Sequence, residues 1–109
     1  MEHVIEEIQY EVPKPLCKQI QLSKETYVSK VLLRENQTEV TIHALPRKMT
    51  SLKNIVSKAL MIFVVEGTVE VIVDGRKHIV TAGETIRIQE KMSYAFYALE
   101  DSKWMELSI

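Results

Sequence analysis

The chain contains little of what would mark several classes of protein. Its 109 residues include one cysteine, three glycines and three prolines. The single cysteine, Cys17, cannot form an internal disulfide, and we interpret it as a small, partly buried apolar residue. No repeat or low-complexity segment is visible. The longest apolar run, residues 59–65, is far too short to cross a bilayer, so no membrane partner is predicted.

No excess of charge points to a charged partner either. There are 14 basic and 15 acidic residues, which give a formal net charge of −1. The absence of a basic stripe argues against a nucleic-acid partner. Residues 1–12 carry acids where a secretory signal needs bases and an apolar stretch, so the expected location is the cytoplasm. The length suits a single domain, residues 1–109, whose core needs no disulfide.

What the sequence does contain is a strong β pattern. Apolar or β-branched residues alternate with polar ones in several short runs, and turn residues separate the runs. The runs are 26–33, 38–45, 60–65, 68–80, 85–89, 94–99 and 103–109. Asp74-Gly75 divides the run 68–80 into a hairpin, because this pair tolerates the positive φ of a tight turn. The pattern predicts about eight strands in an all-β sandwich or small barrel with little helix.

One segment allows two interpretations. Residues 50–61 have apolar side chains at helical spacing behind a possible Ser51 cap, which is typical of an amphipathic helix. The surrounding strands favour a strand and a loop instead. We adopt the strand and loop, and the helix remains the alternative.

The glycines and the hairpin of residues 64–99 resemble the cupin family in its small single-domain form. Gly67 matches the glycine that closes the first cupin motif, Asp74-Gly75 the turn that follows, and Gly83 the glycine that opens the second motif. The resemblance implies a cupin-type antiparallel β-barrel, also called a jelly roll or double-stranded β-helix. It places the barrel core at residues 38–109 and leaves residues 1–25 as an N-terminal arm or edge strand.

The resemblance fails at the family's metal ligands. Counted from Gly67 and Gly83, the positions of the histidine pair, the acid and the second-motif histidine fall at Asn54, Val56, Leu60 and Tyr94. A one-residue shift of the first motif gives Lys53, Ile55 and Ala59 instead. A transition metal needs three or four converging nitrogen, oxygen or sulfur donors, and neither register supplies them. We therefore expect no metal and no other cofactor.

Without its metal ligands, the barrel interior is expected to be an apolar pocket with a polar tip. The predicted ligand-binding residues are Asn54, Tyr94, Leu60, Ile62, Phe96 and His43. We expect a non-catalytic protein that binds or senses a small molecule. One alternative is a metal-independent isomerase or epimerase that uses His43 and Tyr94 for acid–base catalysis. A second alternative is an interaction module whose barrel is filled by its own side chains.

The apolar strands also suggest self-association. The run 60–65 is apolar on both faces, whereas one barrel has one interior. We expect an exposed outer face that includes Phe63, Trp104 and Met105, with residues 8–22 laid on the partner as an edge strand. The prediction is a homodimer.

Overall fold

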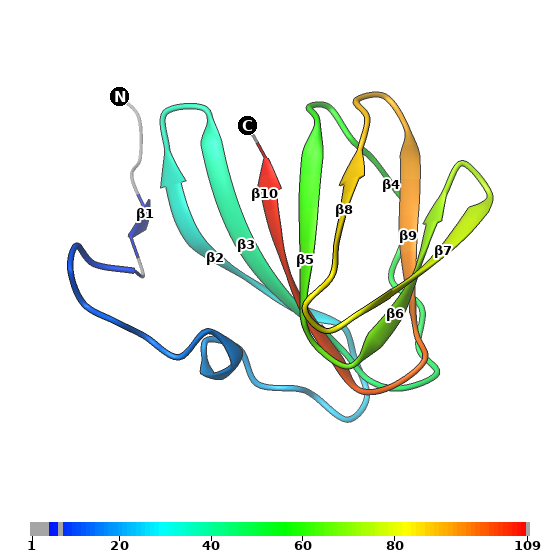
Figure 1. The fold of residues 1–109 in the computed structure, drawn as a ribbon, viewed down its shortest axis with the longest axis horizontal. Coiled ribbons are helices and arrows are strands. Elements are labelled where there is room, and N and C mark those ends of the chain that lie inside the picture. Colours follow the sequence, from blue (N-terminus) through cyan, green and yellow to red (C-terminus); the bar gives the residue numbers. More distant parts are fainter. Residues whose placement is uncertain (1–4, 7, 109) are drawn as a thin grey trace.

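The computed structural model describes residues 5–6 and 8–108, and it is almost entirely β (Figure 1). The strands are β1 (Ile5–Glu6), β2 (Val28–Glu35), β3 (Thr38–Leu45), β4 (Asn54–Ile55), β5 (Leu60–Glu66), β6 (Thr68–Val73), β7 (Arg76–Thr81), β8 (Thr85–Ile88), β9 (Ser93–Ala98) and β10 (Ser102–Ser108). A single turn of 3-10 helix, η1 (Leu16–Lys18), precedes β2. Within the described residues no helix is long and apolar enough to cross a membrane.

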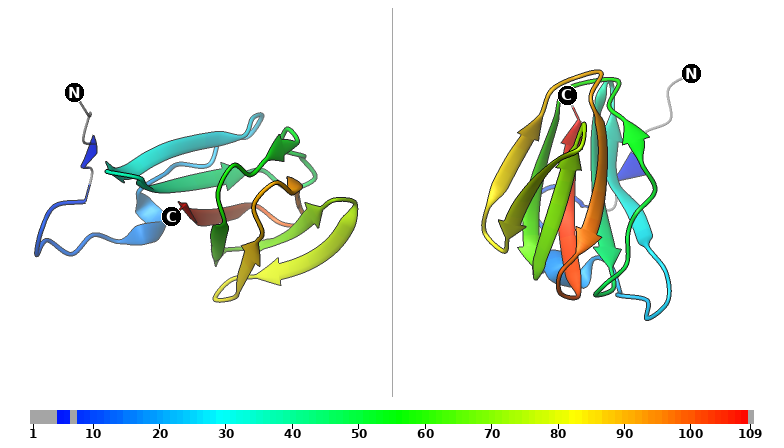
Figure 2. Two further views of the ribbon diagram at one scale, coloured as in Figure 1. Left: turned by 90° about the horizontal axis from the view of Figure 1, so that it is seen from above. Right: turned by 90° about the vertical axis from the view of Figure 1, so that its right-hand side faces the viewer.

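The strands form two antiparallel sheets that face each other (Figure 2). The larger sheet has the order β1-β2-β3-β10-β5-β8, and the smaller has the order β4-β9-β6-β7. Strands β1 and β4 have only two residues each, so the eight longer strands are the number that the sequence pattern predicts. The predicted all-β fold with little helix is confirmed. The larger sheet also includes β2, which ends at Glu35. The sheet therefore begins before residue 38, where the resemblance placed the start of the barrel core.

The core lies between the two sheets and follows the period-two pattern of the strands. In β5 the inward residues are Leu60, Ile62 and Val64, and β6 faces them with Val69 and Val71. The whole cluster consists of Leu45, Val56, Leu60, Ile62, Val64, Val69, Val71, Val73, Val80, Ile88, Phe96, Ala98 and Trp104. Because alternate residues of a strand point to opposite faces, each strand contributes every second side chain.

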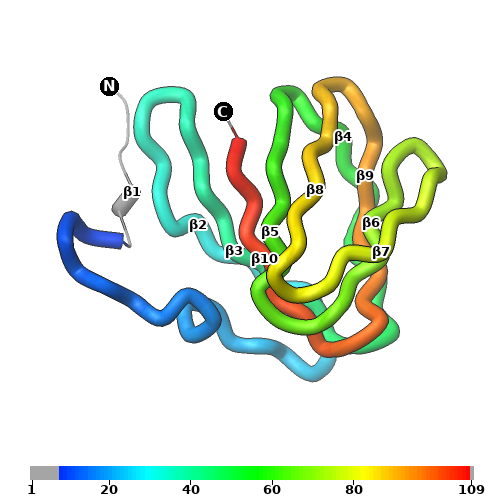
Figure 3. The backbone as a smooth tube through the Cα atoms, viewed as in Figure 1, coloured from blue at the N-terminus to red at the C-terminus, as the bar shows by residue number. Residues whose placement is uncertain are grey.

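Part of the N-terminal segment, residues 16–22, packs on the outer face of the larger sheet in the same chain. Figure 3 shows residues 8–27 running outside the sheets to the start of β2. Ile20 packs with Ile42 and Ala44 in a second buried cluster, and Lys103 Nζ donates a hydrogen bond to the Cys17 carbonyl at 2.7 Å. Residues 16–22 therefore pack on the sheet of their own chain, and a contact of the segment 8–22 with a partner remains a prediction.

The structure corrects the expected position of Trp104. Its side chain is fully buried inside the barrel, whereas its neighbour Met105 points outward and is half-buried, as is Phe63 of β5. Consecutive residues of a strand face opposite sides, so Trp104 and Met105 could not share the outer face.

Residues 50–61 form the predicted strand and loop, with no helix. Val56 N donates to the Met92 carbonyl at 3.0 Å, and Lys91 N donates to the Val56 carbonyl at 2.7 Å. Asn54 of β4 lies opposite Tyr94 of β9. These backbone bonds to a distant part of the chain replace the local bonds that a helix would make, so tertiary context overrides the helical spacing.

Gly67 occupies the turn between β5 and β6 at a point where two backbone segments meet. Its φ is +78°, and a Cβ atom there would collide with the Asp101 carbonyl and the Ser102 hydroxyl. The Ser102 hydroxyl in turn accepts a hydrogen bond from Thr68 N at 3.1 Å. Glycine is required both for the backbone conformation and for the close approach.

Replacing Gly67 by alanine should destabilise the fold strongly. The left-handed backbone alone costs about 1–3 kcal/mol for a residue with a side chain, and the collision adds to this cost. Gly75→Ala is the matched control, because Gly75 has φ +82° but open space around the position of a Cβ. Urea unfolding should give a larger loss for Gly67→Ala than for Gly75→Ala, and equal losses would contradict the packing argument.

A homodimer remains a prediction, although fewer of the residues expected on the outer face are found there. Trp104 no longer supports it, whereas Phe63 and Met105 still point outward and Ile79 on the edge strand β7 is 66% exposed. Sedimentation velocity at tens of micromolar should show a dimer. A single monomeric species at that concentration contradicts the prediction.

Candidate functional site

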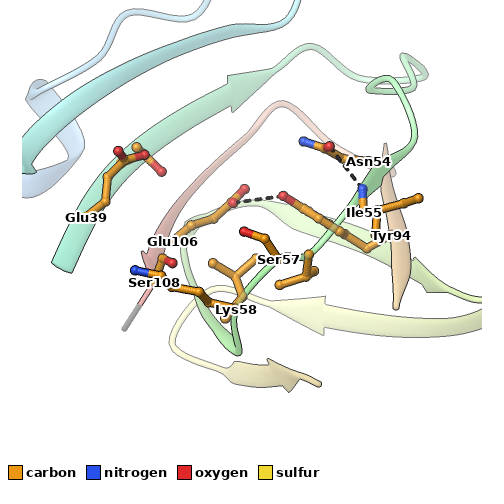
Figure 4. A pocket seen from close by; sticks show the side chains of 11 residues that line it. Glu39, Asn54, Ile55, Ser57, Lys58, Tyr94, Glu106 and Ser108 are labelled. Atoms are coloured by element: carbon orange, nitrogen blue, oxygen red, sulfur yellow. Dashed lines mark hydrogen bonds between the residues drawn. The ribbon is translucent and has the colours of Figure 1, made fainter. Parts of the chain in front are cut away.

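A cavity of about 540 Å³ opens between the two sheets. Its walls come from β2, β3 and β10 of the larger sheet and from β9 and residues 51–54 on the opposite side. A second cavity of about 310 Å³ shares part of the same wall (Figure 4). The residues common to both are Glu39, Thr41, Asn54, Tyr94 and Glu106.

Strand register explains why polar side chains meet here. In β3 and β10 the inward positions place Glu106 opposite Thr41 and Trp104 opposite His43. Tyr94 reaches the same region from β9 of the other sheet. Residues that are far apart in the chain are thus brought together by the pairing of strands and by the packing of the two sheets.

Glu106 is the centre of this polar network. Its Oε2 accepts hydrogen bonds from Trp104 Nε1 at 2.9 Å and lies 3.1 Å from His43 Nε2. Its Oε1 accepts a longer bond, 3.4 Å, from the Tyr94 hydroxyl (Figure 4). Burial raises the pKa of Glu106, while the hydrogen bonds from Trp104 and Tyr94 oppose the shift. The carboxylate is therefore held by donors from both sheets.

His43 is buried, with both ring nitrogens engaged. Nδ1 lies 2.5 Å from the Tyr27 hydroxyl, and Nε2 lies 2.7 Å from Thr41 Oγ1 in addition to its contact with Glu106. Burial lowers the pKa of His43 to about 4, so the imidazole is neutral near pH 7. Burial, together with the charge of Glu106, raises the pKa of Tyr27 to about 12, so its hydroxyl remains a donor. These partners assign the ring proton to Nε2.

Aromatic rings pack behind the network and fix its geometry. Tyr27 stacks on His43, His43 on Trp104, and Trp104 on Phe96, with centroid distances of 5.7, 5.4 and 4.2 Å. Tyr94 meets Phe96 edge-on at 5.8 Å. Such contacts leave the rings few alternative positions, so the donors around Glu106 are held in place.

The structure brings together most of the residues predicted to bind a ligand. Tyr94 and Asn54 line both cavities, Phe96 and His43 line the larger, and Leu60 lines the smaller. Ile62 lines neither, because its side chain is fully buried in the core. A role for any of them in binding remains a prediction.

The cavity wall is more polar than the sequence led us to expect. Sequence reasoning missed the contributions of Glu106, Thr41, Glu39 and Tyr27. The prediction of an apolar lining considered β5 and β9, whereas β3 and β10 supply the polar side chains. A signal was present in residues 103–108, where Glu106 occupies the same face as Trp104.

The residues at the family's metal positions do not fit a transition metal. Val56 and Leu60 are buried in the apolar core. The Asn54 Oδ1 accepts a hydrogen bond from Ile55 N at 3.0 Å. In the part of the chain that the structure describes, no group of three or more His, Cys, Asp or Glu side chains could hold a metal ion. We derive no chemistry through a metal.

Comparison with known proteins agrees with the architecture. Residues 57–109 match the family described as "Cupin domain". The chain has the fold of a small single-domain cupin. A cupin superfamily protein from Desulfitobacterium hafniense superposes with a TM-score of 0.87 at 11% identity, over 99% of this chain and 98% of that one. No curated protein matches in sequence.

Two further solved structures are similar to this cupin-fold chain. A conserved protein of unknown function from Streptococcus pyogenes has a TM-score of 0.86 at 17% identity, over 100% of this chain and 95% of that one. KdgF from Halomonas sp. has a TM-score of 0.67 at 20% identity, over 74% of this chain and 76% of that one. At these identities the likeness shows the fold alone, and fold does not determine function.

The burial of His43 should make stability depend on pH. The folded protein holds the pKa of His43 near 4, whereas an unfolded histidine has a pKa of about 6.5. As the pH falls from about 6.5 to 4, the unfolded chain binds a proton that the folded protein does not, so stability is lost. The raised pKa of Glu106 acts in the opposite direction over part of this range.

The test compares the wild-type protein with His43→Gln. Between pH 7.5 and 4, the wild type should lose roughly 2–3 kcal/mol more unfolding free energy than the variant, measured by urea denaturation. Each protein is compared with its own value at pH 7.5, so a general loss of stability in the variant does not matter. Equal losses in the two proteins would show that His43 is not buried in neutral form.

Proposed function

We propose that the protein binds a small molecule, without a metal, in the cavity between its two sheets and does not catalyse a reaction. The observation that carries the proposal is the cavity of about 540 Å³ beside the buried network of Glu106 and Tyr94. This volume lies in the range of about 300–1,000 Å³ that is usual for small-molecule sites.

Tyr94 is the proposed polar anchor. Its hydroxyl faces Glu106 at 3.4 Å, which is long for a hydrogen bond between two oxygens, and the residue lines both cavities. Burial raises the pKa of Tyr94, and the charge of Glu106 adds to this effect, so the phenol stays protonated and can donate. A ligand acceptor at the usual distance would satisfy this donor better than the long internal bond does.

Two alternatives receive less support. Acid–base catalysis by His43 and Tyr94 requires a ring nitrogen that can exchange a proton with a substrate, but both nitrogens of His43 are bonded within the protein. An interaction module with a filled barrel leaves the cavity beside Tyr94 without a role. The geometry therefore favours binding over both.

The proposal predicts that Tyr94→Phe weakens binding while the fold is retained. Ligands would first be found by thermal-shift screening of a metabolite library against the wild type. Loss of the phenol hydroxyl should reduce the affinity for a ligand that binds in the cavity by about tenfold, which corresponds to about 1.4 kcal/mol. Titration calorimetry on both proteins measures the change.

Tyr97→Phe is the matched control. Tyr97 lies on the same strand, β9, but on the opposite face, and it lines neither cavity. This variant should bind as the wild type does. A library that gives no ligand sensitive to Tyr94→Phe, or equal effects of the two substitutions, would overturn the proposed function.

A further inference from the structure

We infer that the ligand of this cavity is a small organic cation, such as a primary ammonium, whose N–H groups donate to the Glu106 carboxylate. The inference rests on the proposed function and adds the chemical class of the ligand. Three observations support it: the charges around Glu106, the free face of its carboxylate, and the aromatic side chains that line the same cavity.

Glu106 is buried without a positive partner among its contacts. Trp104 and Tyr94 are neutral donors, and His43, whose Nε2 lies 3.1 Å from Glu106 Oε2, is neutral near pH 7. Only 7% of Glu106 is exposed to solvent. A buried charge is costly unless an opposite charge compensates for it, which is why burial raises the pKa of Glu106. A cationic ligand would provide the compensation and favour the carboxylate form.

The basic side chains at the cavity do not neutralise Glu106. Lys53 is exposed, and Lys58 Nζ donates to the Gln37 carbonyl at 2.9 Å. The second acid of the wall, Glu39, already has a cation, because its Oε2 lies 2.6 Å from Arg34 Nε. Glu106 is therefore the acid of the cavity wall that has no cationic partner among the described residues.

The carboxylate also has a free face on the cavity side. Oε2 already receives the Trp104 bond and the contact from His43. Oε1 receives only the 3.4 Å bond from Tyr94, and a carboxylate oxygen can accept two hydrogen bonds. In Figure 4 the side chains of Glu106 and Tyr94 point toward one another at the cavity. An ammonium N–H can donate to Oε1 without displacing the donors on Oε2.

Aromatic side chains border the same cavity, and one face each of Tyr27 and Phe96 is covered by a stacked ring. Tyr27, Tyr94 and Phe96 line the larger cavity together with Glu106. The faces of aromatic rings attract cations within about 6 Å of the ring centre, more strongly where water is excluded. An anionic ligand would instead meet a buried carboxylate, and a neutral alcohol would leave its charge uncompensated.

The test uses three probes of nearly equal shape and different charge: 2-phenylethylammonium, 2-phenylethanol and phenylacetate. Trp104 is the single tryptophan of the chain, and its indole N–H donates to Glu106. The indole resonance in a ¹H–¹⁵N spectrum therefore reports binding at this carboxylate. We expect the ammonium probe to shift this resonance and to bind at least about tenfold more tightly than the alcohol, with no binding of the acid.

Glu106→Gln removes the charge and nearly preserves the shape, so it should abolish the preference for the ammonium over the alcohol. Glu90→Gln is the matched control, because Glu90 is exposed and lies outside both cavities; it should keep the preference. The comparison of the three probes on the wild-type protein stands even if Glu106→Gln does not fold.

Several results would overturn the inference. They are equal or tighter binding of the alcohol or the acid, a preference for the ammonium that survives in Glu106→Gln, or no shift of the Trp104 resonance with any probe. In each case the proposed function would still stand if a library ligand lost affinity on Tyr94→Phe. The two hypotheses can therefore fail separately.

Discussion

The hydrogen bonding of one buried carboxylate organises the interior of this barrel. Glu106 receives donors from its own sheet, Trp104 and His43, and from Tyr94 of the opposite sheet. Because an unpaired buried carboxylate is unfavourable, the position of each donor is constrained by the others. The network thus joins the two sheets near the cavity through the 3.4 Å bond from Tyr94.

The aromatic stack restricts the movement of these side chains and adjoins both the apolar core and the cavity. Trp104 and the inward side chains of β5 and β6 belong to one apolar core. The cavity is bordered by His43, Tyr94 and Glu106. The protein therefore combines a packed half, which stabilises the fold, with an open half whose polar groups can meet a ligand.

The cupin fold persists here although its usual metal donors are replaced. Val56 and Leu60 belong to the apolar core, and Asn54 and Tyr94 pair across β4 and β9. The turn at Gly67 depends on backbone conformation and close packing, so it is independent of a metal. A fold maintained by such features can carry a different kind of site in the same place.

The sequence by itself determined the strands, the Asp74-Gly75 hairpin and the cupin frame, because alternation and turn chemistry are local properties. It also indicated that Tyr94 and Asn54 belong to one region. Only the tertiary structure decided that residues 51–61 are not a helix, that residues 16–22 pack on their own sheet, and that Glu106 is the centre of a polar network. Those outcomes depend on strand register and on contacts between residues far apart in the chain, which local patterns do not encode.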